Sequence, residues 1–191
     1  MPIARKTAFV VIVLALGIAC GLLAMPANAT HTADDHATVP CAGVMASTIM
    51  ASEAEHRLIC AAAETAINRL DQCAIALKRP LSIKVSEVVR SPFGTAIFGR
   101  FDGEADAILV TRADNIEPLT GDTPYRELPL PDFYMSLIVH EVVHAAMHQN
   151  YRRLPTSRAA YEYPAYALQL ETMMPAVRSK LLTTNRGHEE L

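Results

Sequence analysis

The sequence predicts a single α+β domain, and three observations carry that prediction. Residues 45–78 place apolar side chains at helical spacing, with no glycine or proline among them. Residues 81–111 form short β-rich runs with Asp102-Gly103 as a hairpin signal. Residues 132–150 and 158–182 return to a helical pattern. We therefore expect an N-terminal helix, a small sheet that contains antiparallel strands, and two C-terminal helices.

The first 29 residues are predicted to be a signal peptide. Arg5 and Lys6 precede a long apolar run, and Ala27 and Ala29 occupy the small-residue positions of a cleavage site. Cleavage after Ala29 would export the protein to the periplasm or the extracellular space. Two alternatives are an uncleaved membrane anchor, in which case this segment would be the only contact with a membrane, and a lipid anchor on Cys20.

The remaining chain is predicted to be a flexible N-terminus, residues 30–40, followed by one domain, residues 41–191. The full chain of 191 residues has a formal net charge of −3. Removal of the signal peptide takes away two of the 17 basic residues and leaves 20 acidic ones, so the mature net charge is −5. No basic run with interleaved aromatic residues is present, so we do not expect a nucleic-acid partner.

Three cysteines, Cys41, Cys60 and Cys73, would remain after cleavage. Export places them in an oxidising compartment, where one disulfide can form and one thiol is left over. Cys60 and Cys73 lie on the same predicted helix, about 20 Å apart along its axis, which is too far for a bond. We therefore expect Cys41 to pair with one of them. The alternative is that all three are small buried thiols.

The sheet is predicted to hold about three strands. The first covers residues 81–89 and is followed by a turn at 91–94. Residues 95–101 and 104–111 would form the hairpin. Residues 112–131 are rich in proline and are predicted to be a long loop. Because this loop directly precedes the next helix, we expect it to border a cleft.

Two helices are predicted after this loop. The first has Asp132 as its N-cap and runs to about Asn150. The second covers about residues 158–182. Pro164 and Pro175 interrupt it and mark kinks or boundaries.

The first of these helices carries the motif His140-Glu141-Val142-Val143-His144. Histidines four residues apart lie on one helix face, so both imidazoles can reach one tetrahedral ion. Glu141 lies to one side of the pair, where it can take a proton from zinc-activated water and pass it to a leaving amine. The ligand types favour one Zn²⁺ ion per chain. The alternative is an ordinary amphipathic helix that carries two histidines.

A catalytic zinc site needs three protein ligands. We predict that the third is Glu162, which follows His144 after 17 intervening residues and lies in an apolar, tyrosine-rich segment. Binding a cation would offset the cost of burying this carboxylate. Glu171 is the alternative. His148 is placed at the rim, because one straight helix cannot easily bring three successive turns around one ion.

The motif HEVVH, followed by a helical glutamate, resembles the gluzincin metallopeptidases. The pair HEVVHAAMHQN and EYPAYALQ also resembles small secreted proteins of an uncharacterised type, and the resemblance covers about residues 132–170. It implies a minimal zincin-like core with the third ligand on the C-terminal helix. It also implies that His140, His144 and Glu162 bind zinc and that Glu141 is the general base.

The chain departs from the larger gluzincins in two ways. They often have an aspartate four residues after the ligand glutamate, where this chain has Tyr166. They also have a large C-terminal domain that stabilises the oxyanion, whereas only 29 residues follow Glu162 here. Tyr163, Tyr166 and His148 are therefore candidates for contacting the transition state or supporting the metal ligands. Other possible oxyanion donors are Tyr134, Tyr151, Tyr161 and the loop 112–131.

Two functions fit these observations. The first is an exported zinc metallopeptidase that hydrolyses a peptide or amide bond in a peptide or protein substrate. The run DAILVT, residues 106–111, could align an extended substrate as an edge strand. The second is a non-catalytic zinc-binding interaction protein of the cell envelope with the same fold.

Overall fold

The computed structural model describes residues 37–121 and 123–186, which form an α+β structure as predicted. The predicted signal peptide and most of the predicted flexible N-terminus lie outside these residues. Within them, Thr38–Pro40 forms strand β1, which pairs with residues 47–49. This part of the segment that was predicted to be flexible is therefore ordered. None of the helices in the described part of the chain has the length and apolar character needed to cross a membrane.

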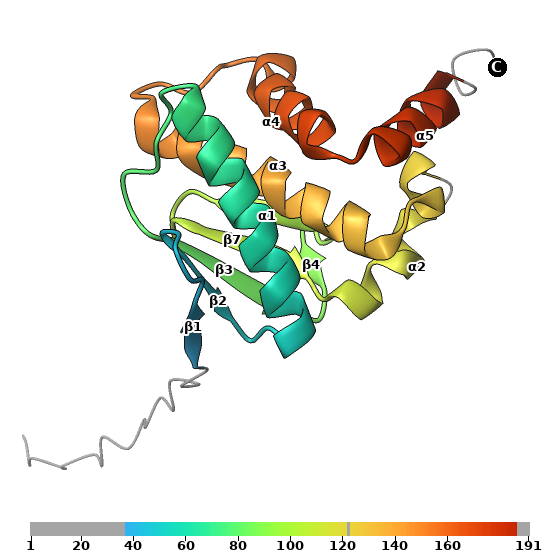
Figure 1. Ribbon diagram of the computed structural model, residues 1–191, viewed down its shortest axis with the longest axis horizontal. Helices are drawn as coiled ribbons and strands as arrows, with labels where there is room; N and C mark the ends of the chain where they lie inside the picture. Colours follow the sequence, from blue (N-terminus) through green and yellow to red (C-terminus); the bar gives the residue numbers. More distant parts are fainter. Residues whose placement is uncertain (1–36, 122, 187–191) are drawn as a thin grey trace, which may run out of the picture. The chain divides into compact units, whose positions relative to one another are not determined.

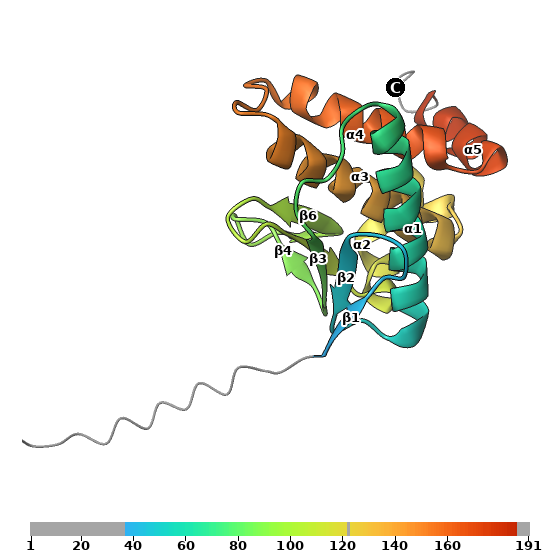
Figure 2. The ribbon, with the colours of Figure 1, turned by 60° about the vertical axis from the view of Figure 1, so that its left-hand side comes forward.

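The main sheet has five strands in the order β1-β2-β3-β7-β6. β1, β2, β3 and β7 can be followed in Figure 1, and β6 in Figure 2. β2, β3 and β7 are parallel to one another, while β1 and β6 are antiparallel strands at the two edges. The bounds of the strands after β1 are β2 (Ala46–Ile49), β3 (Leu81–Ser86), β6 (Gly99–Asp102) and β7 (Ala107–Thr111). A separate two-stranded sheet pairs β4 (Val89–Arg90) with β5 (Ala96–Ile97).

The N-terminal helix α1 (Glu53–Gln72) is shorter than the predicted helix over residues 45–78. Its start is fixed by a capping box, in which the Ser52 side chain and the Glu55 side chain each bond the other's backbone amide. The preceding residues 46–49 form β2 and pair with β3, and the β-branched side chains of Thr48 and Ile49 favour a strand. The helix stops before Ala74, whose φ of 58° lies in the left-handed region.

The predicted hairpin is confirmed. β6 and β7 are antiparallel and joined through Asp102-Gly103, and the turn at 91–94 is present with a φ of 83° at Gly94. The prediction that residues 106–111 form an edge strand is wrong, because β7 pairs with β3 on one side and β6 on the other. The edge beside the motif helix is β6.

The segment predicted to be one long loop contains three short helical pieces. They are η1 (Ala113–Asn115), α2 (Glu117–Thr120) and η2 (Pro124–Glu127). Pro118 and Pro124 lie in the first turns of α2 and η2, where a missing amide hydrogen costs nothing.

The motif helix is α3 (Leu130–Asn150). It begins two residues before Asp132, so this residue lies in the first turn and is not the N-cap. The last predicted helix is divided into α4 (Arg158–Thr172) and α5 (Pro175–Arg186). Pro175 is thus a boundary, whereas Pro164 lies inside α4.

Helix α3 is the centre of the domain. Figures 1 and 2 show it between the sheet and α4, with α1 packed beside it. From Phe133 to Met147 nearly every side chain is buried, on all sides of the helix. The helix is therefore a core helix rather than an amphipathic one, because it is covered by helices and by the sheet at once.

One disulfide joins Cys41, which follows β1, to Cys60 of α1, with Cα atoms 5.3 Å apart. The prediction that Cys41 pairs with one of the two later cysteines is confirmed. Cys73 is exposed and has a free thiol.

Candidate metal centre

The histidines of the motif and Glu162 converge at one point, as predicted. Nε2 of His140 and Nε2 of His144 are 3.0 Å apart. The Oε2 atom of Glu162 lies 3.2 Å from the first nitrogen and 3.4 Å from the second. The two histidines come from successive turns of α3 and the glutamate comes from α4, which packs against it.

These three atoms fit the ligand set of a tetrahedral zinc ion. Ligands at about 2.0–2.1 Å from zinc lie about 3.3 Å from one another, and the three separations in this site bracket that value. Burial lowers the pKa of both His140 and His144, so both rings are neutral at pH 7 and offer lone pairs. Two imidazole nitrogens and one carboxylate form a donor set typical of zinc.

A hydrogen-bond chain sets the orientation of the His140 ring. Gln169 donates from Nε2 to Oγ of Ser136 at 3.1 Å, and Ser136 donates to the backbone oxygen of Phe133 at 2.8 Å. The Oε1 atom of Gln169 is therefore left to accept from Nδ1 of His140, 3.1 Å away. With its proton on Nδ1, the ring must present a lone pair on Nε2. This role of Gln169 was not predicted from the sequence.

His144 is held by packing instead. The Tyr161 ring stacks on it with a centroid distance of 4.3 Å and an interplanar angle of 13°. Its Nδ1 atom is buried and has no hydrogen-bond partner in the described part of the chain. Tyr166 contacts His140 edge to face, with ring centroids 4.6 Å apart. Burial raises the pKa of both tyrosines, so both hydroxyls stay protonated and can donate.

Glu141 lies beside the three converging groups but is not one of them. Only 5% of the residue is exposed, and burial raises the pKa of its carboxyl to about 8. A hydrogen bond from the backbone amide of Phe101, on the edge strand β6, and the charge of Arg100 oppose that rise. The pKa of this buried carboxyl therefore lies well above that of an exposed glutamate.

A cleft of about 600 Å³ opens onto this centre. Its walls include Gly99, Arg100 and Phe101 of β6, along with α3 and α4. Tyr125, from the segment expected to border a cleft, is also part of the lining, which confirms that expectation. Six of the candidates named from the sequence line this cleft: His140, Glu141, His144, Tyr161, Glu162 and Tyr166.

The other candidates from the sequence lie elsewhere. Tyr163 is 74% exposed and does not line the cleft. His148 packs on Phe101 with ring centroids 5.3 Å apart and lines a neighbouring cavity. Glu171 forms an ion pair with Arg69. Tyr151 is exposed and Tyr134 is fully buried, and neither lines the cleft.

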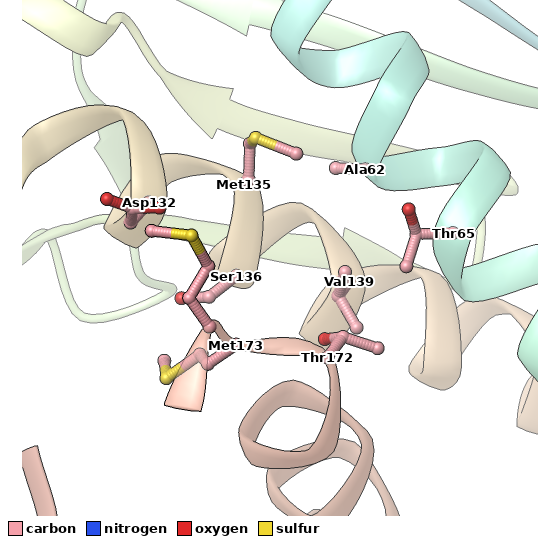
Figure 3. A pocket seen from close by; sticks show the side chains of 9 residues that line it. Ala62, Thr65, Asp132, Met135, Ser136, Val139, Thr172 and Met173 are labelled. Atoms are coloured by element: carbon pink, nitrogen blue, oxygen red, sulfur yellow. The ribbon is translucent and has the colours of Figure 1, made fainter. Parts of the chain in front are cut away.

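Another and much smaller cavity, of about 100 Å³, is shown in Figure 3. It is enclosed by α1, α3 and the connection between α4 and α5. Ser136 lines it and also bonds Gln169, so the hydrogen-bond chain that orients His140 separates the two cavities.

Comparison with known proteins finds one family. A sequence model described as "Family of unknown function (DUF6639)" matches residues 47–190, which include every strand and helix from β3 to α5 and the whole candidate centre. No curated protein and no solved structure matches the chain.

Proposed function

The chain belongs to DUF6639, a family of unknown function, and we propose that it is a zinc-dependent metallopeptidase or related amide hydrolase. The observation that carries the proposal is the convergence of His140, His144 and Glu162 at tetrahedral separations, at the floor of an open cleft. In this proposal the three side chains hold one zinc ion per chain, in a zincin-like core.

The chemistry can be divided among the residues of the cleft. Zinc, when bound, supplies Lewis acidity that polarises a carbonyl and makes water acidic near neutral pH. Glu141 takes the proton from the attacking water and delivers it to the leaving nitrogen. Tyr161 and Tyr166 offer hydroxyl donors where charge develops on the carbonyl oxygen. Gln169 holds the His140 ring in the tautomer that leaves Nε2 free.

Two further features support hydrolysis of a chain-like substrate outside the cytosol. The edge strand β6 lines the cleft, so an extended peptide can lie along it by strand addition. The Cys41–Cys60 disulfide agrees with an oxidising compartment, as the signal-peptide pattern predicts.

The first experiment is the zinc content of the purified protein, measured by elemental mass spectrometry. We expect about one zinc per chain in the wild type and in Glu141→Gln, and loss of most of it in His144→Ala and Glu162→Ala. Glu171→Ala is the matched control, because its carboxylate pairs with Arg69. Wild-type protein that takes up no zinc on titration would refute the proposal.

The second experiment separates an enzyme from a binding protein. The alternative function is a non-catalytic zinc-binding protein of the cell envelope, and such a protein has no use for Glu141. Glu141→Gln should keep its zinc and lose about 10²–10⁴-fold of the peptide-hydrolysing rate. If the zinc-loaded wild type cleaves no peptide in a degenerate library, the alternative is favoured.

A further inference from the structure

One face of α4 supplies several groups to the cleft. Arg158, Glu162, Tyr166 and Gln169 all line it and follow helical spacing. The Glu162 carboxylate lies beside Nε2 of His140, and the Gln169 amide forms a hydrogen bond with Nδ1 of the same ring. Tyr166 contacts the His140 ring. Arg158 is the first residue of the helix, one turn before Glu162 or about 6 Å along the axis. None of the roles described above uses Arg158.

Arg158 is a cation without an acidic partner in the described residues. Glu162 is four residues away on the same face, a spacing at which arginine and glutamate often pair. The two form no ion pair, because the Glu162 carboxylate points to the histidines. The first turn of α4 has no acidic residue either, although the positive end of a helix disfavours a cation there.

The other cation of the cleft is already neutralised in part. Arg100 of β6 donates from Nη2 to Oδ2 of Asp102 at 2.8 Å. The two acidic residues of the lining are Glu141 and Glu162, and both have roles in the proposed chemistry. Among the described residues that line the cleft, Arg158 is therefore the cation without an acidic partner. An unpaired guanidinium at this position favours an anionic group on the ligand.

An aromatic wall lies in the same cleft. The rings of Phe98, Tyr125 and Phe133 form one cluster, with Tyr125 stacked on Phe133 at a centroid distance of 4.7 Å. Ile97 and Leu137 add aliphatic surface to this wall. Such a surface accepts a large apolar side chain.

We propose that the cleft recognises a peptide in which a carboxylate lies close to a large apolar residue, and that Arg158 binds the carboxylate. The guanidinium can hold it with two parallel hydrogen bonds, while the aromatic wall takes the apolar side chain. One helical turn from the proposed ligand Glu162 corresponds to about two residues of extended peptide, at about 3.3 Å each. The carboxylate belongs either to an acidic side chain or to a free C-terminus. The inference rests on the proposed function for its substrate class.

The test is peptide binding to the zinc-loaded Glu141→Gln protein, followed by fluorescence anisotropy. One labelled sequence rich in leucine and phenylalanine is made in three forms. The first has a glutamate and an amidated C-terminus, the second has glutamine and an amidated C-terminus, and the third has glutamine and a free C-terminus. We expect at least one carboxylate form to bind about tenfold or more tightly than the neutral form. The form that does so identifies the source of the carboxylate.

Arg158→Ala, added to the same protein, should reduce this ratio to nearly one. Arg158→Lys should retain part of it, because a charge remains but the two parallel bonds are lost. The matched control is Arg57→Ala, which removes the same charge from an exposed position on α1 and should leave the ratio unchanged. Equal binding of the three forms, no binding of any form, or a ratio that survives Arg158→Ala would overturn the inference.

Cleavage of the same peptides by the zinc-loaded wild type tells the two proposals apart. Cleavage without a preference for carboxylate forms refutes the role of Arg158 and leaves the hydrolase intact. A binding preference lost in Arg158→Ala, with no cleavage of any form, supports the recognition site and counts against hydrolysis.

Discussion

Gln169 is the side chain on which the orientation of His140 depends. It is buried, and its amide uses both ends, accepting from Nδ1 of His140 and donating to Ser136. An amide in this position fixes the tautomer without adding a charge to the centre. The proposed ligand set therefore carries one negative charge, that of Glu162.

Gln169→Leu should weaken zinc binding by about 10–100-fold, because the His140 ring loses the acceptor that holds it. Gln169→Glu should keep most of the affinity, since a carboxylate accepts the same hydrogen bond. Competition with a zinc chelator of known affinity measures both. Equal affinities of Gln169→Leu and the wild type would show that packing alone orients the ring.

The candidate centre could be predicted from the sequence only in part. The four-residue step from His140 to His144 predicted that the two histidines share a helix face. The 17 residues between His144 and Glu162 leave room for a loop and a returning helix, and the three side chains do converge. The sequence spacing could not show which of the tyrosines faces the cleft. Tyr161 and Tyr163 lie about 100° to either side of Glu162 on α4, and only the packing against α3 decides that Tyr161 faces the cleft. Gln169 lies two turns after Glu162, and nothing local marks it.

Among the elements, β2 shows why composition misleads. Ala46–Ile49 lie in the stretch that was predicted to be helical, yet they form a strand that is antiparallel to β1 and parallel to β3. The alternation of buried Ala46 and Thr48 with half-buried neighbours is too short to distinguish a strand from a helix end. Ser52 and Glu55 form a capping box that does mark the start of α1, and this signal identifies the true boundary.

Glu55 connects the start of α1 to the segment after β7. Its carboxylate accepts from the backbone amides of Ser52 and Ala113 and lies 4.0 Å from Arg112. Burial alone would raise its pKa, but these hydrogen bonds outweigh burial, and the pKa lies below its ordinary value of 4.5. The stability that this carboxylate contributes is thus complete above pH 4.5 and is lost as the pH falls through its lower folded-state pKa.

Glu55→Gln should therefore lower the free energy of unfolding by about 1–3 kcal/mol at pH 7, because charged hydrogen bonds become neutral ones. The difference from the wild type should shrink as the pH is taken below 4.5. Urea unfolding at a series of pH values measures it. Glu53→Gln is the control, since this carboxylate is exposed and its ion pair within the described residues is with Arg57. A pH-independent difference would contradict the linkage.

The disulfide links α1 to the segment between β1 and β2, where Cys41 lies. Because it closes a loop with a sequence separation of 19, its removal by Cys41→Ser with Cys60→Ser should cost about 3 kcal/mol of unfolding free energy. Cys73→Ser should change stability little, because that thiol is exposed and free. Thermal unfolding of the three proteins under non-reducing conditions gives the comparison. An unchanged midpoint in the double variant would mean that the unfolded chain is not restrained by the bond.

At the scale of the whole molecule, the candidate centre joins two layers. His140 and His144 belong to the buried helix α3, whereas Glu162 belongs to α4, which covers it. An ion held by all three would bind the folded chain and not the unfolded one, so it would stabilise the domain.

The α+β fold itself could be predicted from the sequence, but the order of its strands depends on contacts between distant segments that no local pattern encodes.

Free zinc at a hundredfold excess over its dissociation constant should add about 2.7 kcal/mol to the free energy of unfolding and raise the midpoint of thermal unfolding by about 5–10 °C.

Removal of zinc with a chelator should increase amide hydrogen exchange in α4 more than in α1 or β3, because α4 would lose an anchor to α3. Hydrogen-exchange mass spectrometry with and without zinc tests this. A uniform increase over all elements would mean that the ion does not act through α4.

The two edges of the sheet differ in how they are protected. β1 has three residues and ends in Pro40, so it offers little backbone for pairing with another molecule. β6, at the other edge, ends the sheet beside an open cleft. A second molecule could add a strand there in the same way as the proposed peptide substrate. Self-association at high concentration should therefore begin at β6, and a ligand that fills the cleft should also keep the protein monodisperse.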